Sequence, residues 1–456
     1  MLFLAVGLCP PAGLAATEDA VTLDPSITYQ TFTDWEATAQ AGQEFPAFAR
    51  YGDSLFDQAV NDLGLNRLRL EIHSNAENRV DYWTEHRAGR IDDATWSAHL
   101  ATAVNDNDDP RVIDPAGFQF ASLDHNVETV VLPVQRRLEA RGEKLRVNLC
   151  YVSFLRKPSP DAPYPHESPE EYAEFVLATC LHLRAKYGWA PDLWETILEP
   201  DNTYFWRGPQ IGRAIVAAGR RLRANGFATR FIAPSTTDMG RAPVYADGLL
   251  EIPEALPFVA ELAYHRYGGV SAKNLLAIAE RAARNKLGAS MLEHIGSGYQ
   301  DLHQDLKLGR NTAWQQYTLA FPGVKDDGAQ YYVIDESDPA APRAVPGVRT
   351  PFLRQYFRYI RRGAVRIEAA ATDVWLDPLA FVNADGTRVV VVKTDAGGAF
   401  AVRGLPAGRY GITFTTAARS GVDAEDVTIS EGQSVAAAIP AAGVATIYGK
   451  PAQPRR

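Results

Sequence analysis

Two glutamates stand where apolar stretches of the chain come to an end. Glu199 follows the stretch 193–198 and precedes Pro200, and Glu293 follows the stretch 289–292. Because proline cannot donate a hydrogen bond to a neighbouring strand, we expect the first stretch to be a β-strand that ends at Glu199. Two carboxyl groups facing one another can cleave a glycosidic bond: one protonates the leaving oxygen and the other attacks the anomeric carbon. Taken singly, each glutamate is more often the partner in a structural ion pair.

The elements that would position these side chains alternate between residues 34 and 362. The pattern predicts strands at 66–72, 144–154, 193–199, 230–235, 261–267, 289–293 and 314–321, and helices at 54–63, 168–187, 209–225, 272–286 and 351–361. Alternation over this length implies parallel strands linked by crossovers and favours an α/β fold, the (β/α)8 TIM barrel. A doubly wound open sheet is the alternative, but no glycine-rich phosphate loop follows a predicted strand.

Polar residues cluster at the predicted strand ends, which is where barrels carry their active groups. They are Arg69 and Glu71, Glu199 with Asp201 and Asn202, His265 with Tyr267, and Glu293 with His294. Counting one more barrel strand before residues 66–72, the two glutamates fall on the predicted fourth and seventh strands.

Residues outside the barrel segment show a different sequence pattern. Short strands separated by turns at 383–386 and 395–398 predict a C-terminal β-sandwich over 363–450, and the alternating stretch 17–33 is expected to add strands to it. Residues 1–16 contain no charged residue and end in small residues, as in a secretory signal, which predicts a secreted or periplasmic protein; a disordered apolar tail is the alternative. This stretch is too short to span a bilayer, and no other segment is predicted to do so.

Composition narrows the classes of partner and cofactor. The 456 residues carry a formal net charge of −9, and a modest acidic excess without a basic run argues against nucleic acid or anionic lipid as the main partner. If the leader is removed, Cys150 and Cys180 remain; two buried thiols are favoured, and a disulfide stays open. The chain has no CxxC motif, no Cys/His cluster and no GxSxG motif. We therefore predict no metal and no cofactor, and disfavour a serine esterase.

Several segments resemble glycoside hydrolase family 30, within the clan of retaining (β/α)8 glycoside hydrolases. The segments are 29–35, similar to the start of that family's first barrel strand, 193–202 with Glu199-Pro200, 264–267, 291–293, and 356–367, similar to its passage into the side β-sandwich. The resemblance implies that Glu199 is the general acid/base, that Glu293 is the nucleophile, and that the anomeric configuration is retained.

Two departures from that family bear on the substrate. The clan usually has Asn before its acid/base, to bond the sugar hydroxyl next to the anomeric carbon; here the residue is Leu198, and Asn202 could substitute. The family's glycine-rich end of the first strand is replaced by residues 33–36. Here Asp34 and Glu36 would accept hydrogen bonds from sugar hydroxyls, and Trp35 would offer a stacking face.

The resemblance extends to other substrate-contacting residues. Arg69 matches the arginine on the clan's second strand, which orients the nucleophile; a structural ion pair is the alternative. His265 and Tyr267 could line the same subsite, with Tyr267 bonding the nucleophile, or could be packed core residues. Four further aromatic residues are candidate sugar-stacking platforms, although ordinary packing is more common for each: Trp83, Tyr204, Trp206 and Trp314.

The long insertion after the second predicted strand, residues 73–124, shows no strong periodicity. A loop at this end of a barrel strand commonly grips the substrate. It contains the Asn/Asp run 105–109, whose oxygens could bind calcium; a solvated turn with side-chain-to-backbone hydrogen bonds is favoured.

These patterns predict a retaining glycoside hydrolase that acts on a β-linked oligo- or polysaccharide. The alternative is a non-catalytic carbohydrate-binding protein on the same scaffold, in which Leu198 marks lost activity. A metal-dependent hydrolase on a barrel is a third, weaker reading.

Overall fold

The computed structural model describes residues 19–154, 164–323 and 325–451, so the leader-like residues 1–16 lie outside the described part. The chain divides into two compact units. One is formed by residues 30–364 and the other by the described parts of 1–29 and 365–456.

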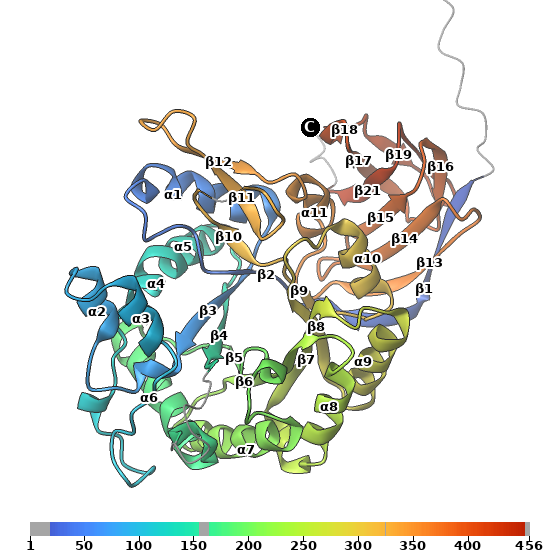
Figure 1. The fold of residues 1–456 in the computed structure, drawn as a ribbon. Coiled ribbons are helices and arrows are strands. Elements are labelled where there is room, and N and C mark those ends of the chain that lie inside the picture. Colours follow the sequence, from blue (N-terminus) through green and yellow to red (C-terminus); the bar gives the residue numbers. More distant parts are fainter. Residues whose placement is uncertain (1–18, 155–163, 324, 452–456) are drawn as a thin grey trace, which may run out of the picture. The chain divides into compact units, whose positions relative to one another are not determined.

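Eight parallel strands form a closed barrel in the larger unit (Figure 1). They are β2 (Asp34–Thr38), β3 (Arg67–His73), β4 (Arg146–Val152), β5 (Leu193–Glu195), β6 (Arg230–Asp238), β7 (Val259–Gly268), β8 (Gly288–Glu293) and β9 (Ala313–Trp314). Each pairs with the next, and β2 also pairs with β9, which closes the ring. The predicted TIM barrel is confirmed. The fourth predicted strand is shorter than expected because regular pairing stops at Glu195, before Pro200.

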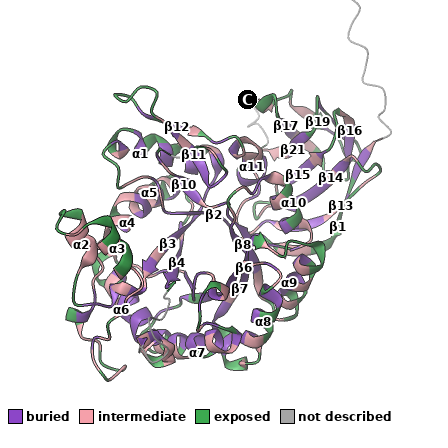
Figure 2. Cartoon of the chain, viewed as in Figure 1, coloured by how far each residue is buried: buried purple, intermediate pink, exposed green. Residues whose placement is uncertain are grey.

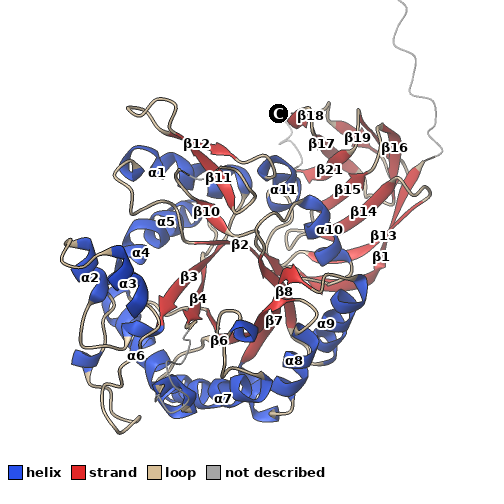
Figure 3. Cartoon of the chain, viewed as in Figure 1, coloured by secondary structure: helices blue, strands red, loops and turns tan. Residues whose placement is uncertain are grey.

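Helices surround this ring of strands (Figure 3). They are α1 (Phe48–Asp57), α5 (Leu132–Ala140), α6 (Pro169–Tyr187), α7 (Gly208–Ala224), α8 (Ala242–Leu250), α9 (Ala272–Arg284), α10 (Tyr299–Lys307) and α11 (Thr350–Phe357). Helix α6 shows how the sequence sets these bounds: the Ser168 side chain accepts a hydrogen bond from the Glu171 N–H, and Gly188 ends the helix at φ 79°. The strands are largely buried inside the helical ring (Figure 2).

The insertion 73–124 folds into short helices rather than one irregular loop. They are α2 (Tyr82–Arg87), α3 (Asp93–His99) and α4 (Ala121–Asn126). The side chains of Asp81 and Asp92 cap the N-termini of α2 and α3. Each accepts a hydrogen bond from the backbone N–H of the third residue further along the chain. With 6 or 7 residues, these helices are too short to display a repeating apolar stripe, which is why periodicity did not predict them.

The last predicted strand, 314–321, is two strands. Barrel strand β9 ends at Trp314, and β10 (Thr318–Ala320) pairs with β2 and with β11 (Gln330–Asp335), to which β12 (Arg343–Pro346) pairs antiparallel. None of the described helices is long and apolar enough to cross a membrane.

The smaller unit is one ten-stranded, mainly antiparallel sheet. Its strands are β1 (Ala20–Thr31), β13 (Val365–Ala371), β14 (Leu376–Val382), β15 (Arg388–Thr394), β16 (Gly398–Arg403), β17 (Gly408–Thr416), β18 (Arg419–Asp423), β19 (Val427–Ile429), β20 (Val435–Ile439) and β21 (Gly443–Lys450). Side chains such as Val21, Phe400 and Ile447 share one core cluster, so the sheet curls around a single interior. The predicted side β-domain is present, and β1 adds its N-terminal strand.

Candidate active site

Glu199 and Glu293 lie at the carboxyl ends of the fourth and seventh barrel strands, counting from β2. Glu293 is the last residue of β8, and Glu199 follows β5 after an irregular turn. Glu199 has left-handed backbone angles, φ 49° and ψ 60°, and its N–H donates to the Ser235 carbonyl oxygen at 3.1 Å. A non-glycine residue in this region costs about 1–3 kcal/mol and persists where the surroundings hold it, as they often do at functional sites.

The two carboxyl groups meet at the mouth of the barrel. One carboxylate oxygen of each, together with a ring nitrogen of His265, lie within 4.8 Å of one another. The two carboxylic side chains are 13% and 11% exposed, whereas His265 is fully buried. One oxygen of each group thus lies within the spacing of about 5–5.5 Å that is typical of two carboxyl groups acting directly at one sugar carbon.

Glu293 is held by two donors from other strands. The Arg69 guanidinium donates to its Oε2 at 2.7 Å, and the Tyr267 hydroxyl donates to its Oε1 at 3.2 Å. Arg69 is fully buried and also donates to both carboxylate oxygens of Glu195, at 2.8 and 2.9 Å. These bonds fix the orientation of the Glu293 carboxylate, whose side chain stays 11% exposed at the barrel mouth.

Glu199 is held by a different set. His265 Nδ1 lies 3.0 Å from Glu199 Oε1, and the Asn202 amide donates to Oε2 at 2.9 Å and to the Thr237 hydroxyl at 2.8 Å. Burial favours the neutral carboxyl, but the bonds and charge of His265, with the bonds of Thr237 and Asn202, outweigh it and lower the pKa of Glu199. The free protein therefore holds Glu199 ionised near neutral pH.

A third carboxyl group, Glu71 on β3, lies beside this pair. Burial, opposed by Arg69 and reinforced by the charges of Glu293 and Glu195, raises the pKa of Glu71 to about 7. Glu71 also lines a cavity with Trp83 of the insertion. The insertion therefore borders the carboxyl cluster through the cavity that Glu71 and Trp83 share.

Sequence reasoning missed three residues of this site. Glu195, Ser235 and Tyr317 surround the base of the carboxyl cluster: the Ser235 hydroxyl donates to Glu195, and the charges of Glu71 and Glu293 add to burial in raising the Tyr317 pKa. The sequence did contain a signal for Glu195, because it is a charged residue inside the apolar stretch 193–198.

Asp34 and Trp35 lie at the opposite end of the barrel. Asp34 is fully buried and its carboxylate pairs with Arg146 at 2.6 Å, while the Trp35 indole N–H donates to the Ile360 carbonyl oxygen at 2.8 Å. The expected sugar contacts do not fit these positions. The physical reason is that the first barrel strand begins at Asp34 instead of ending there.

The four candidate stacking residues separate into two groups. Trp206 and Trp314 are 2% and 0% exposed, so neither offers a ring face to a sugar. Tyr204 is 39% exposed, and its hydroxyl donates to Glu167. Trp83 and Tyr204 thus remain accessible, and the other two belong to the core.

Leu198 occupies the position before the acidic residue as part of an apolar cluster. It is 7% exposed and packs with Cys150 and Val152, so it presents no polar group to a sugar hydroxyl. Cys150 and Cys180 are both buried and unpaired, as favoured from the sequence.

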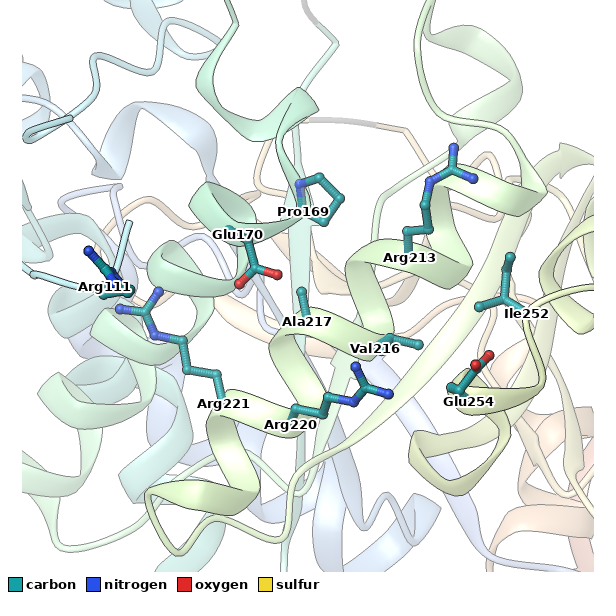
Figure 4. A pocket seen from close by; sticks show the side chains of 10 residues that line it. All are labelled: Arg111, Pro169, Glu170, Arg213, Val216, Ala217, Arg220, Arg221, Ile252 and Glu254. Carbon is teal, nitrogen blue, oxygen red and sulfur yellow. The ribbon is translucent and has the colours of Figure 1, made fainter. Parts of the chain in front are cut away.

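A second cavity, of about 650 Å³, lies among the outer helices (Figure 4). Its lining comes largely from α6 and α7 and does not include Glu199 or Glu293. The charged residues around it are Arg111, Glu170, Arg213, Arg220, Arg221 and Glu254.

The chain matches no protein family model and no curated protein. It does match solved structures. A GH30 endoxylanase from Clostridium papyrosolvens C71 and the catalytic domain of GH30 xylanase C from Talaromyces cellulolyticus each have a TM-score of 0.68 and 16% identity, covering 95% of this chain and 100% of theirs. An endo-β-1,6-glucanase has a TM-score of 0.65 and 16% identity, covering 95% of each chain. At such identity the likeness establishes the fold, and it confirms the resemblance to glycoside hydrolase family 30 at that level.

Proposed function

We propose that this protein is a retaining glycoside hydrolase that cleaves a β-linked oligo- or polysaccharide. The observation that carries the proposal is the meeting of Glu199 and Glu293, with carboxylate oxygens within 4.8 Å, at the mouth of the barrel. The solved structures with this fold include proteins described as xylanases and as a glucanase, which supports the same reaction class.

In the first step, the Glu293 carboxylate attacks the anomeric carbon while the Glu199 carboxylic acid protonates the departing oxygen. Arg69 and Tyr267 orient the Glu293 oxygens for this attack. In the second step, ionised Glu199 takes a proton from water, and the resulting hydroxide displaces Glu293 from the sugar. Two inversions at one carbon give overall retention.

Because Glu199 is ionised in the free protein, it must gain a proton before the first step. Its lowered pKa makes this easiest in mildly acidic solution. A bound sugar that excludes water from the cleft would further favour the neutral acid.

Substitutions at the two glutamates test the proposal. Glu199→Ala and Glu293→Ala should each remove most turnover of an aryl β-glycoside, and azide should restore the first with a retained product and the second with an inverted one. Glu261→Gln is a matched control, because Glu261 is a buried glutamate on β7 that pairs with Arg67 at 2.8 Å, away from Glu293. Full activity in either alanine variant refutes the assignment.

Two alternative functions predict different outcomes in the same assays. A carbohydrate-binding protein without activity would bind sugars across a broad panel and hydrolyse none. A metal-dependent hydrolase could use Glu199, His265 and Glu293 as ligands, and its activity would disappear on chelation. We expect activity to survive a chelator, because Arg69 and Tyr267 already occupy the Glu293 oxygens.

We also propose that the protein is exported, on the basis of the leader-like residues 1–16.

A further inference from the structure

The cavity that joins Glu71 to the insertion is not used by any step of the proposed mechanism. Its lining combines two indole rings with several polar side chains, all half-buried: Glu71, Asn75, Trp83, Trp96, Gln119 and Ser122. Pockets that bind small molecules typically have aromatic walls and a few polar groups that fix the orientation of the ligand. The cavity therefore has the chemical character of a binding pocket, and Glu71 connects it to the carboxyl cluster.

Glu71 lies on the same face of β3 as Arg69, because the two residues are two positions apart on one strand. Arg69 binds Glu293, and Glu71 is one step closer to the carboxyl end of the strand. The charge of Glu293 contributes to the raised pKa of Glu71, which also shows that the two carboxyl groups are near one another. A sugar bonded to Glu293 would therefore lie beside Glu71.

Two oxygen atoms at this position lack a hydrogen-bond donor. The Gln40 amide donates to Glu71 Oε2 at 3.4 Å, whereas Glu71 Oε1 has no partner among the described residues. Gln40 Oε1 is buried, and no donor reaches it from the described part of the chain. Buried polar atoms are nearly always paired, so these acceptors favour a ligand that carries a hydroxyl group.

The size of the cavity limits what it can hold. Its volume is about 30 Å³, which is room for about two water molecules at about 10–15 Å³ each. This is too little for a sugar ring, but it suits a hydroxymethyl group, which has one carbon and one oxygen atom. Hexopyranosides carry this group on C5, and pentopyranosides lack it. Only the ring oxygen separates C5 from the anomeric carbon, so the group stays close to the atom that Glu293 attacks.

The charges around the cavity favour a neutral substituent. Neither lysine nor arginine is among the described residues that line it, and the Asp81 carboxyl group contributes to the lining. Burial lowers the pKa of His73, another lining residue, to about 4, so its imidazole is neutral near pH 7. The carboxylate of a uronic acid would meet other carboxyl groups here with no cation to pair with.

We propose that this cavity binds the C5 hydroxymethyl group of the sugar that bonds to Glu293, with Glu71 Oε1 accepting a hydrogen bond from its hydroxyl. The protein then selects β-linked hexosides over pentosides and uronides. This inference rests on the proposed glycosidase function and narrows its substrate class.

Two matched pairs of nitrophenyl glycosides test this selectivity. The β-D-glucoside and the β-D-xyloside differ only in the hydroxymethyl group, and so do the β-D-galactoside and the α-L-arabinopyranoside. In at least one pair, kcat/KM for the hexoside should exceed that for the pentoside by at least about tenfold, as expected when a pocket loses a methylene and a hydrogen-bonded hydroxyl. A ratio below this in both pairs would overturn the assignment while leaving the glycosidase function intact.

Filling the cavity gives a second test with a matched control. Ser122→Leu places a larger side chain in the lining, and Ser97→Leu makes the same change at an exposed position of α3 outside the cavity. Ser122→Leu should lower kcat/KM for the preferred hexoside by at least about tenfold and for its matched pentoside by less than about twofold. Ser97→Leu should change neither value. Equal losses for hexoside and pentoside in Ser122→Leu would contradict the proposal.

A binding measurement decides the question even if the protein hydrolyses no glycoside. Calorimetry on Glu293→Gln can compare the methyl glycosides of the same two matched pairs without turnover. The hexoside of at least one pair should bind at least about tenfold more tightly than its pentoside. Equal affinities in both pairs would show that the cavity does not recognise the hydroxymethyl group, whereas absent turnover with selective binding would refute the glycosidase function alone.

Discussion

Replacing Arg69 with methionine should separate catalysis from stability. Arg69 and Arg67 lie two residues apart on β3, so both side chains point into the barrel, and both are fully buried. Arg69 binds Glu195 and Glu293, whereas Arg67 binds Glu36 and Glu261, at 2.8 Å each. Arg67→Met is therefore a control with equal burial and a similar ion network.

The magnitudes follow from these contacts. Breaking a buried ion pair by removing one partner costs about 3–5 kcal/mol, so both variants should lose stability by this amount. The bond from Arg69 to Glu293 is worth about 1.5–3 kcal/mol, which corresponds to a further loss of about 10- to 150-fold in kcat/KM for Arg69→Met. Tm measurements and aryl glycoside kinetics, performed well below both Tm values, check these expectations.

The pH dependence of stability sharpens the test. Burial raises the pKa of Glu195, but Arg69 and His265 outweigh burial and lower it. A lowered folded-state pKa stabilises the wild type above about pH 4.5, and this contribution is lost as the pH falls. Without Arg69, burial dominates and raises the pKa of Glu195 in the folded variant. The difference in free energy of unfolding between the wild type and Arg69→Met should therefore become smaller as the pH falls from about 7 to about 5. Equal losses of kcat/KM in the Arg67 and Arg69 variants would refute the role assigned to Arg69.

Three other predictions use the same structure. His265→Asn should raise the pKa of Glu199 by removing its charged partner, so the basic limb of the kcat/KM profile should move to higher pH; an unmoved limb contradicts that pairing. Trp83→Ala should raise KM for a polysaccharide by about 2- to 10-fold with little change in Tm, as kinetics and thermal unfolding would show. A thiol reductant should leave the Tm unchanged because Cys150 and Cys180 are unpaired, and a drop in Tm would reveal a disulfide.

Much of the barrel could be predicted because its signals are local. Ser168 and Gly188 bound helix α6 in the sequence as they do in the structure, and the end of β8 at Glu293 follows from an apolar stretch that stops at a polar residue. Such signals depend on neighbours along the chain, so they survive without knowledge of tertiary contacts.

The remaining errors concern which end of a strand a residue occupies. Trp35 follows a turn and could face either end; its burial against Phe357, with ring centroids 4.0 Å apart, depends on a helix more than 300 residues away. Glu195 was missed because its partner Arg69 comes from another strand.

The stereochemistry of the first product tests the central claim most directly. Proton NMR can follow hydrolysis of a β-linked substrate before the product mutarotates. With Glu199 and Glu293 this close, the account predicts that the β-anomer appears first and the α-anomer grows in later. Initial release of the α-anomer would contradict it, because inversion requires a water between the sugar and a more distant carboxylate.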